Sequence, residues 1–205
     1  MVATEAIQTF IINGAIMLMF IYFGIKLLMQ KRNRLAITIS GLFLIAALGL
    51  GLNILYRLLN DHRFNIIGNQ LTIILTNLSL IFLFSFTQII RKSSVEFTVK
   101  KQVLYTIIYT VFLCGLFLIP NGVTWDYEST DSVLGVPVWS WWFSVYGLIC
   151  SQFIIILIIR NGIITYNSMG EKESLYVRKY MYSLIGLILL NIVIIGNYVF
   201  NALNT

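Results

Sequence analysis

The chain has 205 residues, of which 59% are hydrophobic and only 11% are charged, and its mean hydropathy is +0.87. A soluble domain is about half apolar and a quarter charged, so this composition excludes an ordinary soluble enzyme, a disordered chain and a secreted disulfide scaffold. The net charge is +6, but no segment resembles a nucleic-acid-binding module. We therefore expect an integral membrane protein with no nucleic-acid partner.

Six apolar segments, separated by clusters of charge, predict six membrane-spanning helices. Each contains a run of about 20 or more residues without a charged side chain, which is the length that a helix needs to cross the bilayer core. We predict an all-α polytopic transmembrane bundle that forms a single domain over residues 1–205. The spans are predicted at residues 6–28, 35–57, 66–90, 102–120, 138–160 and 180–202.

Lysine and arginine are distributed unevenly among the segments that connect these spans. Twelve of the 14 gather on one set of segments, whereas Arg57 and Arg63 lie on the other set. Because positive charges are retained on the cytoplasmic side, the first set is predicted inside and both termini outside. We expect a multi-pass protein of the cell membrane whose partners are the lipid bilayer and other membrane or cytoplasmic protein chains. The twelve cations are Lys26, Lys31, Arg32, Arg34, Arg91, Lys92, Lys100, Lys101, Arg160, Lys172, Arg178 and Lys179.

The sequence offers little catalytic or metal-binding chemistry. His62 is the single histidine, and a metal site needs clustered ligands, so we expect no metal, no cofactor and no enzymatic activity. Cys114 and Cys150 are predicted at different depths, which argues against a disulfide. Arg57 and Asp61 are four residues apart and are predicted to form an exposed ion pair, a weak interaction.

The third span carries most of the polar side chains that fall within the predicted helices. On a helical wheel, Asn69, Thr72 and Thr76 share one face with further hydroxyl groups, and Asn77 flanks that face. A polar face in hydrocarbon must meet other helices or a hydrated cavity, so this helix is predicted at the centre of the bundle. Two interpretations stay open: hydrogen bonding that fixes the helices together, or a lining for a neutral polar ligand.

Two stripes run along the fifth span. One suits close helix packing and consists of Ser140, Ser144, Gly147 and Ser151. The other is aromatic, contains Trp139, Trp142 and Tyr146, and lies near the outer boundary. An interfacial aromatic belt explains the second stripe. The alternative is an aromatic rim around an outward-facing pocket, which could suit a cation or an amphiphile.

The candidate ligand-binding residues are therefore amides and hydroxyls of the third span and aromatics of the fifth. They are Asn69, Thr72, Thr76, Asn77, Trp139, Trp142 and Tyr146. Single amides in other spans are expected to make helix–helix contacts rather than to bind a ligand. They are Asn13, Asn53, Asn191 and Asn197.

Three short stretches carry a resemblance to a known family. They are Gly135–Trp139 followed by Trp142, Phe143 and Tyr146; Tyr176-Val177-Arg178-Lys179-Tyr180; and Ser183-Leu184-Ile185-Gly186-Leu187-Ile188 with Asn191 downstream. Together they resemble the N-terminal seven-helix sensor region of many archaeal and bacterial histidine kinases. That family has a seventh helix leading to a signalling domain, whereas six helices are predicted here. The resemblance thus implies a truncated sensor region, or a stand-alone relative that signals through another protein.

Three functions are compatible with these observations. The first is a sensor or receptor-like module that binds a small ligand from outside or from the lipid phase and signals through a partner. The second is a structural or assembly subunit of a larger membrane complex. The third is a small carrier for a neutral solute, which is weakened by the lack of an internal repeat.

Overall fold

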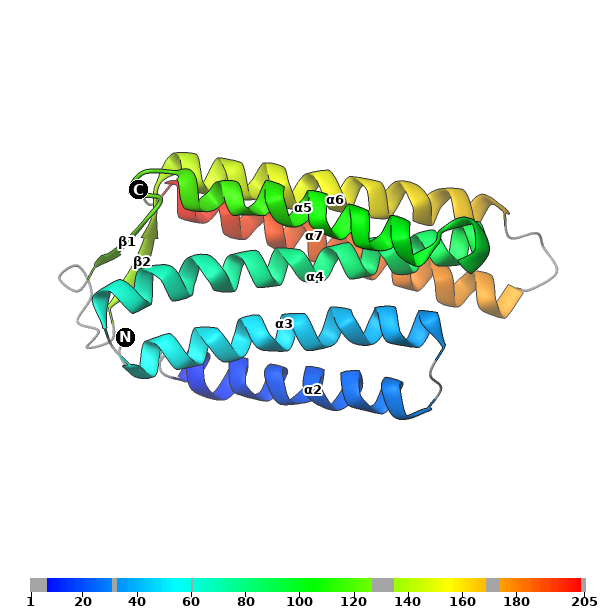
Figure 1. Ribbon diagram of the computed structural model, residues 1–205, viewed down its shortest axis with the longest axis horizontal. Helices are drawn as coiled ribbons and strands as arrows, with labels where there is room; N and C mark the ends of the chain where they lie inside the picture. Colours follow the sequence, from blue (N-terminus) through cyan, green and yellow to red (C-terminus); the bar gives the residue numbers. More distant parts are fainter. Residues whose placement is uncertain (1–6, 31–32, 60, 127–134, 169–173, 204–205) are drawn as a thin grey trace.

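The computed structural model describes residues 7–30, 33–59, 61–126, 135–168 and 174–203. Within them, six α-helices run nearly parallel to one long axis, and two short strands lie at one end (Figure 1). The helices are α2 (Asn13–Gln30), α3 (Arg34–Leu59), α4 (His62–Glu96), α5 (Val99–Cys114), α6 (Trp141–Ser168) and α7 (Ser174–Leu203). A π-helical turn, η1 (Ile7–Ile12), precedes α2, and a 3₁₀ turn, η2 (Gly115–Leu118), follows α5. The strands are β1 (Val123–Asp126) and β2 (Val136–Trp139).

Short polar side chains set the beginnings of four helices. Asn33 accepts a hydrogen bond from the backbone of Ala36 at 2.7 Å, and Asp61 accepts one from Phe64 at 2.9 Å. Thr98 and Ser140 accept equivalent bonds in the first turns of α5 and α6. Each side chain satisfies a backbone N–H that has no partner within the helix, which fixes where the helix starts.

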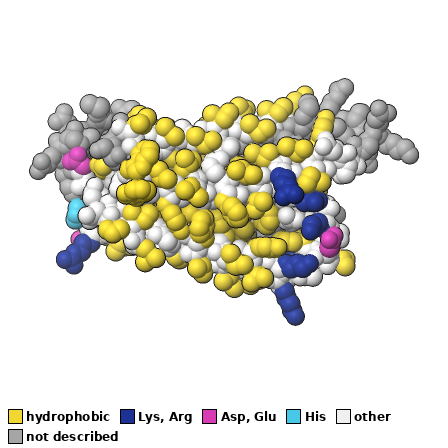
Figure 2. Space-filling view, turned by 90° about the horizontal axis from the view of Figure 1, so that it is seen from above, with side chains coloured by type: hydrophobic (Ala, Val, Ile, Leu, Met, Phe, Trp, Pro, Cys, Tyr) yellow, Lys and Arg dark blue, Asp and Glu magenta, His cyan; other side chains and the backbone are white. Residues whose placement is uncertain are grey.

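Five helical segments are long and apolar enough to cross a membrane: Phe10–Gln30, Arg34–Leu59, His62–Ser93, Val99–Leu118 and Trp141–Ser168. A shorter apolar helical segment spans Asn191–Leu203 of α7. Large apolar side chains are exposed along these helices and cover the middle of the molecule between its ends (Figure 2). An exposed surface of this size needs a hydrocarbon environment, so the chain is a multi-pass membrane protein, as its composition predicts.

Helix α4 lies at the centre of the bundle, as the polar face of this segment predicts. In the most apolar 18-residue stretch of α4, 50% of the residues are buried inside the protein, compared with 6% in the corresponding stretch of the first span, Phe10–Gln30. It packs against α3 on one side and against α5 and α6 on the other, while α2 packs on α3 and α7 packs on α6. The apolar core lies mainly between α4, α5 and α6 and includes Leu113, Phe143 and Cys150, all fully buried.

The segment before α6 differs from the prediction that a helix begins at residue 138. Residues Val136–Trp139 form strand β2, which pairs with β1 in an antiparallel β-ribbon, and α6 starts only at Trp141. Pro137 has no backbone N–H and its ring restricts the preceding residue to extended conformations, both of which disfavour a helix here. Helix α5 ends before Pro120, close to the predicted boundary.

The small residues of α6 pack as a stripe, with one exception. Ser144, Gly147 and Ser151 are buried, and Gly147 lies directly against the ring of Tyr198 on α7. Ser140 precedes the helix and caps it instead. A helix that starts at Trp141 cannot include Ser140 in its face, which corrects the predicted four-residue stripe.

Gly147→Ala should weaken the contact between α6 and α7. A Cβ at this position would lie 2.6 Å from Cε1 of Tyr198, and overpacking of this kind costs about 1–3 kcal/mol. We expect a lower thermal midpoint of unfolding in detergent. The matched control is Gly196→Ala on α7, where nothing lies within 4 Å of the added Cβ. Equal midpoints for the two variants would contradict the packing described.

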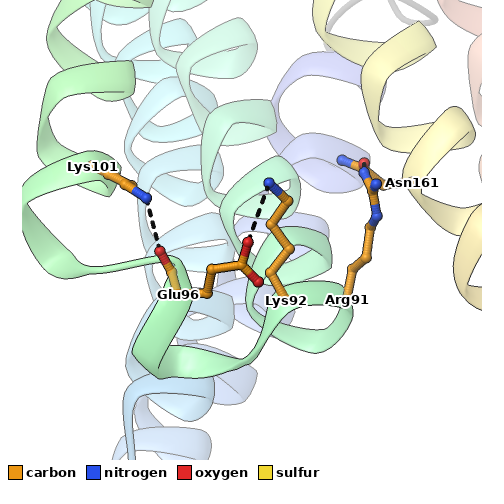
Figure 3. A network of polar contacts seen from close by, with 5 residues as sticks. All are labelled: Arg91, Lys92, Glu96, Lys101 and Asn161. Atoms are coloured by element: carbon orange, nitrogen blue, oxygen red, sulfur yellow. Dashed lines mark hydrogen bonds and ion pairs between the residues drawn. The ribbon is translucent and has the colours of Figure 1, made fainter.

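Cations gather at the end of the bundle opposite the β-ribbon, which we call the cation-rich end (Figure 2). Here Arg91 Nη1 donates to Asn161 Oδ1 at 2.8 Å and so links α4 to α6 (Figure 3). Lys92 pairs with Glu96 at 3.9 Å, and Lys101 Nζ donates to the Glu96 carbonyl oxygen at 3.0 Å. Of the predicted inner cations, Lys31, Arg32 and Lys172 lie outside the described residues.

The distribution of charge predicts that the β-ribbon end faces the outside of the cell. In a background with both cysteines replaced by alanine, a cysteine at Thr124 should react with a membrane-impermeant maleimide on intact cells. Both Thr124 on β1 and Lys100 on α5 are exposed. A cysteine at Lys100 should react only after the membrane is permeabilised. Labelling in the reverse pattern would show the opposite orientation.

Candidate ligand-binding site

Asn69 of α4 joins three separate elements at the β-ribbon end. Its Nδ2 donates to the Tyr56 hydroxyl of α3 at 3.1 Å, and its Oδ1 accepts from Nε1 of Trp139 at 3.0 Å. All three side chains are buried. Buried polar groups are costly unless they are paired, so this amide holds the β-ribbon and α3 in fixed positions against α4.

Asn77, two turns further along α4, makes the equivalent link to α7. Its Nδ2 donates to the Tyr198 hydroxyl at 3.0 Å and to the carbonyl oxygen of Ile73 at 2.9 Å. The Tyr198 ring also contacts Trp139, with ring centroids 5.6 Å apart. Asn69 bonds to Trp139 and Asn77 bonds to Tyr198, so the contact between these two rings connects the two amides in addition to α4 itself.

Helices α3 and α4 approach closely through a hydroxyl on one helix and a glycine on the other. Thr72 Oγ1 donates to the carbonyl oxygen of Gly49 at 3.3 Å. A Cβ on Gly49 would lie 3.1 Å from Oγ1 of Thr76, so a larger side chain would push the helices apart. Thr76 itself donates to the Thr72 carbonyl oxygen at 2.8 Å.

Around these groups lies a cavity of about 570 Å³. It is walled by α3, α4 and α7, with Phe20 from α2 and Trp139 from the β-ribbon. A cavity of this size, with apolar walls and a few convergent polar groups, is typical of a small-molecule site. Its polar lining consists of Asn53, Tyr56, Arg57, Asn69, Thr72, Thr76, Asn77, Ser79, Trp139, Asn197 and Tyr198.

Five of the seven predicted ligand-binding residues line this cavity: Asn69, Thr72, Thr76, Asn77 and Trp139. The other two, Trp142 and Tyr146, do not. Trp142 is 71% exposed, and the Tyr146 hydroxyl donates to the carbonyl oxygen of Phe112 on α5 at 2.7 Å. The helical wheel groups Trp142 and Tyr146 with Trp139 in one stripe. Trp139 belongs to strand β2 instead of helix α6, and its indole bonds to Asn69 of α4.

Several residues of the cavity were not predicted as ligand candidates. Asn53, Tyr56 and Arg57 share one face of α3, and Asn197 and Tyr198 come from α7. Asn53 and Arg57 are one helical turn apart, and this spacing in the sequence already indicates that their side chains share a face of the helix. Single amides outside the third span are predicted to make helix–helix contacts. Asn191 of α7 does so, because its Oδ1 accepts a hydrogen bond from Gln152 Nε2 of α6 at 2.8 Å. Asn53 and Asn197 line the cavity instead.

Arg57 does not pair with Asp61 as predicted. Helix α3 ends at Leu59, and the Asp61 carboxylate accepts from the backbone of Phe64 at the start of α4. The guanidinium of Arg57 instead lies over the ring of Trp125, 5.9 Å from its centroid. The chain turns between the two residues, so the i to i+4 geometry of a continuous helix is lost.

Within the described residues, no three His, Cys, Asp or Glu side chains gather as metal ligands. Both cysteines are free thiols, with Cys150 buried and Cys114 exposed. The chain matches none of the known protein families, curated proteins or solved structures with which it was compared.

Asn69→Leu should destabilise the protein, because it leaves the buried Trp139 N–H and Tyr56 hydroxyl without a partner. Such orphaned groups cost about 1–3 kcal/mol, which we expect to see as a lower thermal midpoint and altered tryptophan emission. The control is Asn201→Leu, because the Asn201 amide donates to Asn197 of its own helix and, among the described residues, links α7 to no other element. If Asn69→Leu is as stable as this control, Asn69 does not hold the β-ribbon in place.

Proposed function

We propose that this protein is a membrane-embedded sensor or receptor-like module that binds a small ligand in the cavity between α3, α4 and α7. The observation that carries the proposal is the position of the cavity, at the junction of two groups of helices. One group is α2 with α3 and the other is α5, α6 and α7. A ligand at such a junction contacts both groups at once.

Signalling would follow from a population shift between two arrangements of these groups. A ligand changes the balance only if it binds one arrangement more tightly than the other. Helix α4 extends from the cavity to the cation-rich end, where Arg91 links it to Asn161 of α6 (Figure 3). A change in spacing at the cavity would thus reach the inner surface, where a partner protein would detect it.

The extent of the cavity favours a sensor over a carrier. Its lining on α4 begins at Asn69 and stops at Leu83, ten residues or about 15 Å before Ser93, where the helical backbone is interrupted. The resemblance to sensor regions of histidine kinases is consistent with this function.

Binding can be tested with dansylamino-undecanoate and the full chain in phosphatidylcholine nanodiscs. In a Trp141→Phe/Trp142→Phe background, Trp125 and Trp139 remain as donors for energy transfer at the β-ribbon end. Ala46→Phe places a ring in the cavity, because Ala46 is nearly buried and lines it. We expect saturable energy transfer that Ala46→Phe reduces at least severalfold.

The matched control is Leu48→Phe, which adds a ring on the exposed side of the same helix. It should retain the transfer, since it changes only the lipid-facing surface. Equal transfer in both variants would show that the probe reports on bilayer lipid, and the proposed site would be wrong. Spin labels at Gln30 and Ser168 should also change their separation when the probe is added, and a constant separation would refute the signalling role.

A further inference from the structure

The lining of the cavity changes from polar to apolar along the bundle axis. Near the β-ribbon it contains amides, aromatic hydroxyls and Arg57. Toward the cation-rich end it contains Ser79 and otherwise apolar side chains: Phe20, Leu42, Phe43, Ala46, Leu80 and Leu83. Arg57 and Leu42 are fifteen residues apart on α3, which is about 22 Å along the helix axis. The cavity therefore has one polar end and one apolar end.

The dimensions of the cavity limit what can occupy it. Its volume of about 570 Å³ extends along about 22 Å of α3, so the cavity is elongated. A single alkyl chain suits this shape, and it matches the apolar end in chemistry.

Arg57 is the charged group at the polar end. Its Nε is buried and has no hydrogen-bond partner, while the guanidinium lies over Trp125. Among the described residues, the one ion pair is Lys92–Glu96, which lies at the opposite end of the bundle from Arg57. A partly desolvated guanidinium that meets no anion among the described residues can bind one, and a carboxylate or phosphate within reach would form charge-assisted hydrogen bonds with it.

Asn53 adds a second polar contact one turn deeper on the same face of α3. Its Oδ1 is buried and has no hydrogen-bond partner, and the side chain lines the cavity. Buried acceptors without a partner are rare in folded proteins, because burial removes their hydrogen bond to water and nothing replaces it. Oδ1 can only accept, so an anionic head group would hydrogen-bond to the Arg57 guanidinium and to Nδ2 of Asn53, and the two side chains mark one place where a head group would be held.

From this arrangement, and resting on the proposed function, we infer that the ligand is a single-chain amphiphile with an anionic head group. The head group accepts hydrogen bonds from Arg57, and Asn53 contacts the polar atoms next to it. The alkyl chain lies between α3 and α4 and ends near Leu42 and Leu83. The preference for an anion over a neutral head comes from Arg57.

Competition between two unlabelled molecules of equal chain length tests this inference. Dodecanoate and dodecanol are titrated against bound dansylamino-undecanoate in the nanodiscs described above, at matched concentrations in the bilayer. A charge-assisted hydrogen bond corresponds to about tenfold or more in affinity. We expect dodecanoate to displace the probe at a concentration at least about tenfold lower than dodecanol.

Arg57→Gln should abolish this difference, whereas Arg57→Lys should retain most of it. The control is Arg63→Gln, which removes a cation from an exposed position at the same end and should leave the preference intact. If Arg57→Gln fails to fold, Asn53→Leu gives an independent test, with weaker displacement by dodecanoate expected. Equal displacement by the acid and the alcohol would overturn the anionic head group but leave the cavity as a binding site. A probe that never enters the cavity would overturn the proposed function as well.

Discussion

The arrangement of this bundle depends on the need to pair the amides of a helix that lies in hydrocarbon. Water is absent from the bilayer core, so an unpaired amide there is costly. Asn69 satisfies its amide with Tyr56 and Trp139, and Asn77 uses Tyr198. Through these bonds α4 specifies the positions of α3, the β-ribbon and α7, none of which is fixed by apolar contact alone.

The same bonds explain why a cavity remains beside the central helix. Helix α7 packs on α6 and reaches α4 through the bond between Tyr198 and Asn77. Helix α3 packs closely on α4 through Thr72 and Gly49. The space left between α3 and α7 opens beside the polar face of α4, so the amides that hold the bundle together also line this cavity.

The β-ribbon divides the tryptophans into two groups with different roles. Trp141 and Trp142 are exposed, as expected for an aromatic belt at the membrane interface. Trp125 and Trp139 are buried and meet Arg57 and Asn69 respectively. In the antiparallel register Val123 pairs with Trp139 and Trp125 pairs with Pro137. Trp139 lines the cavity, and Trp125 lies against Arg57 and Tyr56 beside it.

Composition and helical periodicity alone established the membrane class, the long apolar helices and the central place of α4, because bilayer thickness and the cost of polar groups in lipid act on local sequence. The helical wheel also placed Asn69, Thr72, Thr76 and Asn77 on or beside one polar face, and all four line the cavity. The packing of the helices was needed to show that Val136–Trp139 is a strand, that Arg57 meets Trp125 rather than Asp61, and that Asn53 and Tyr198 join the cavity. These contacts connect residues distant in sequence, so they depend on how the helices pack and not on the periodicity of any one of them.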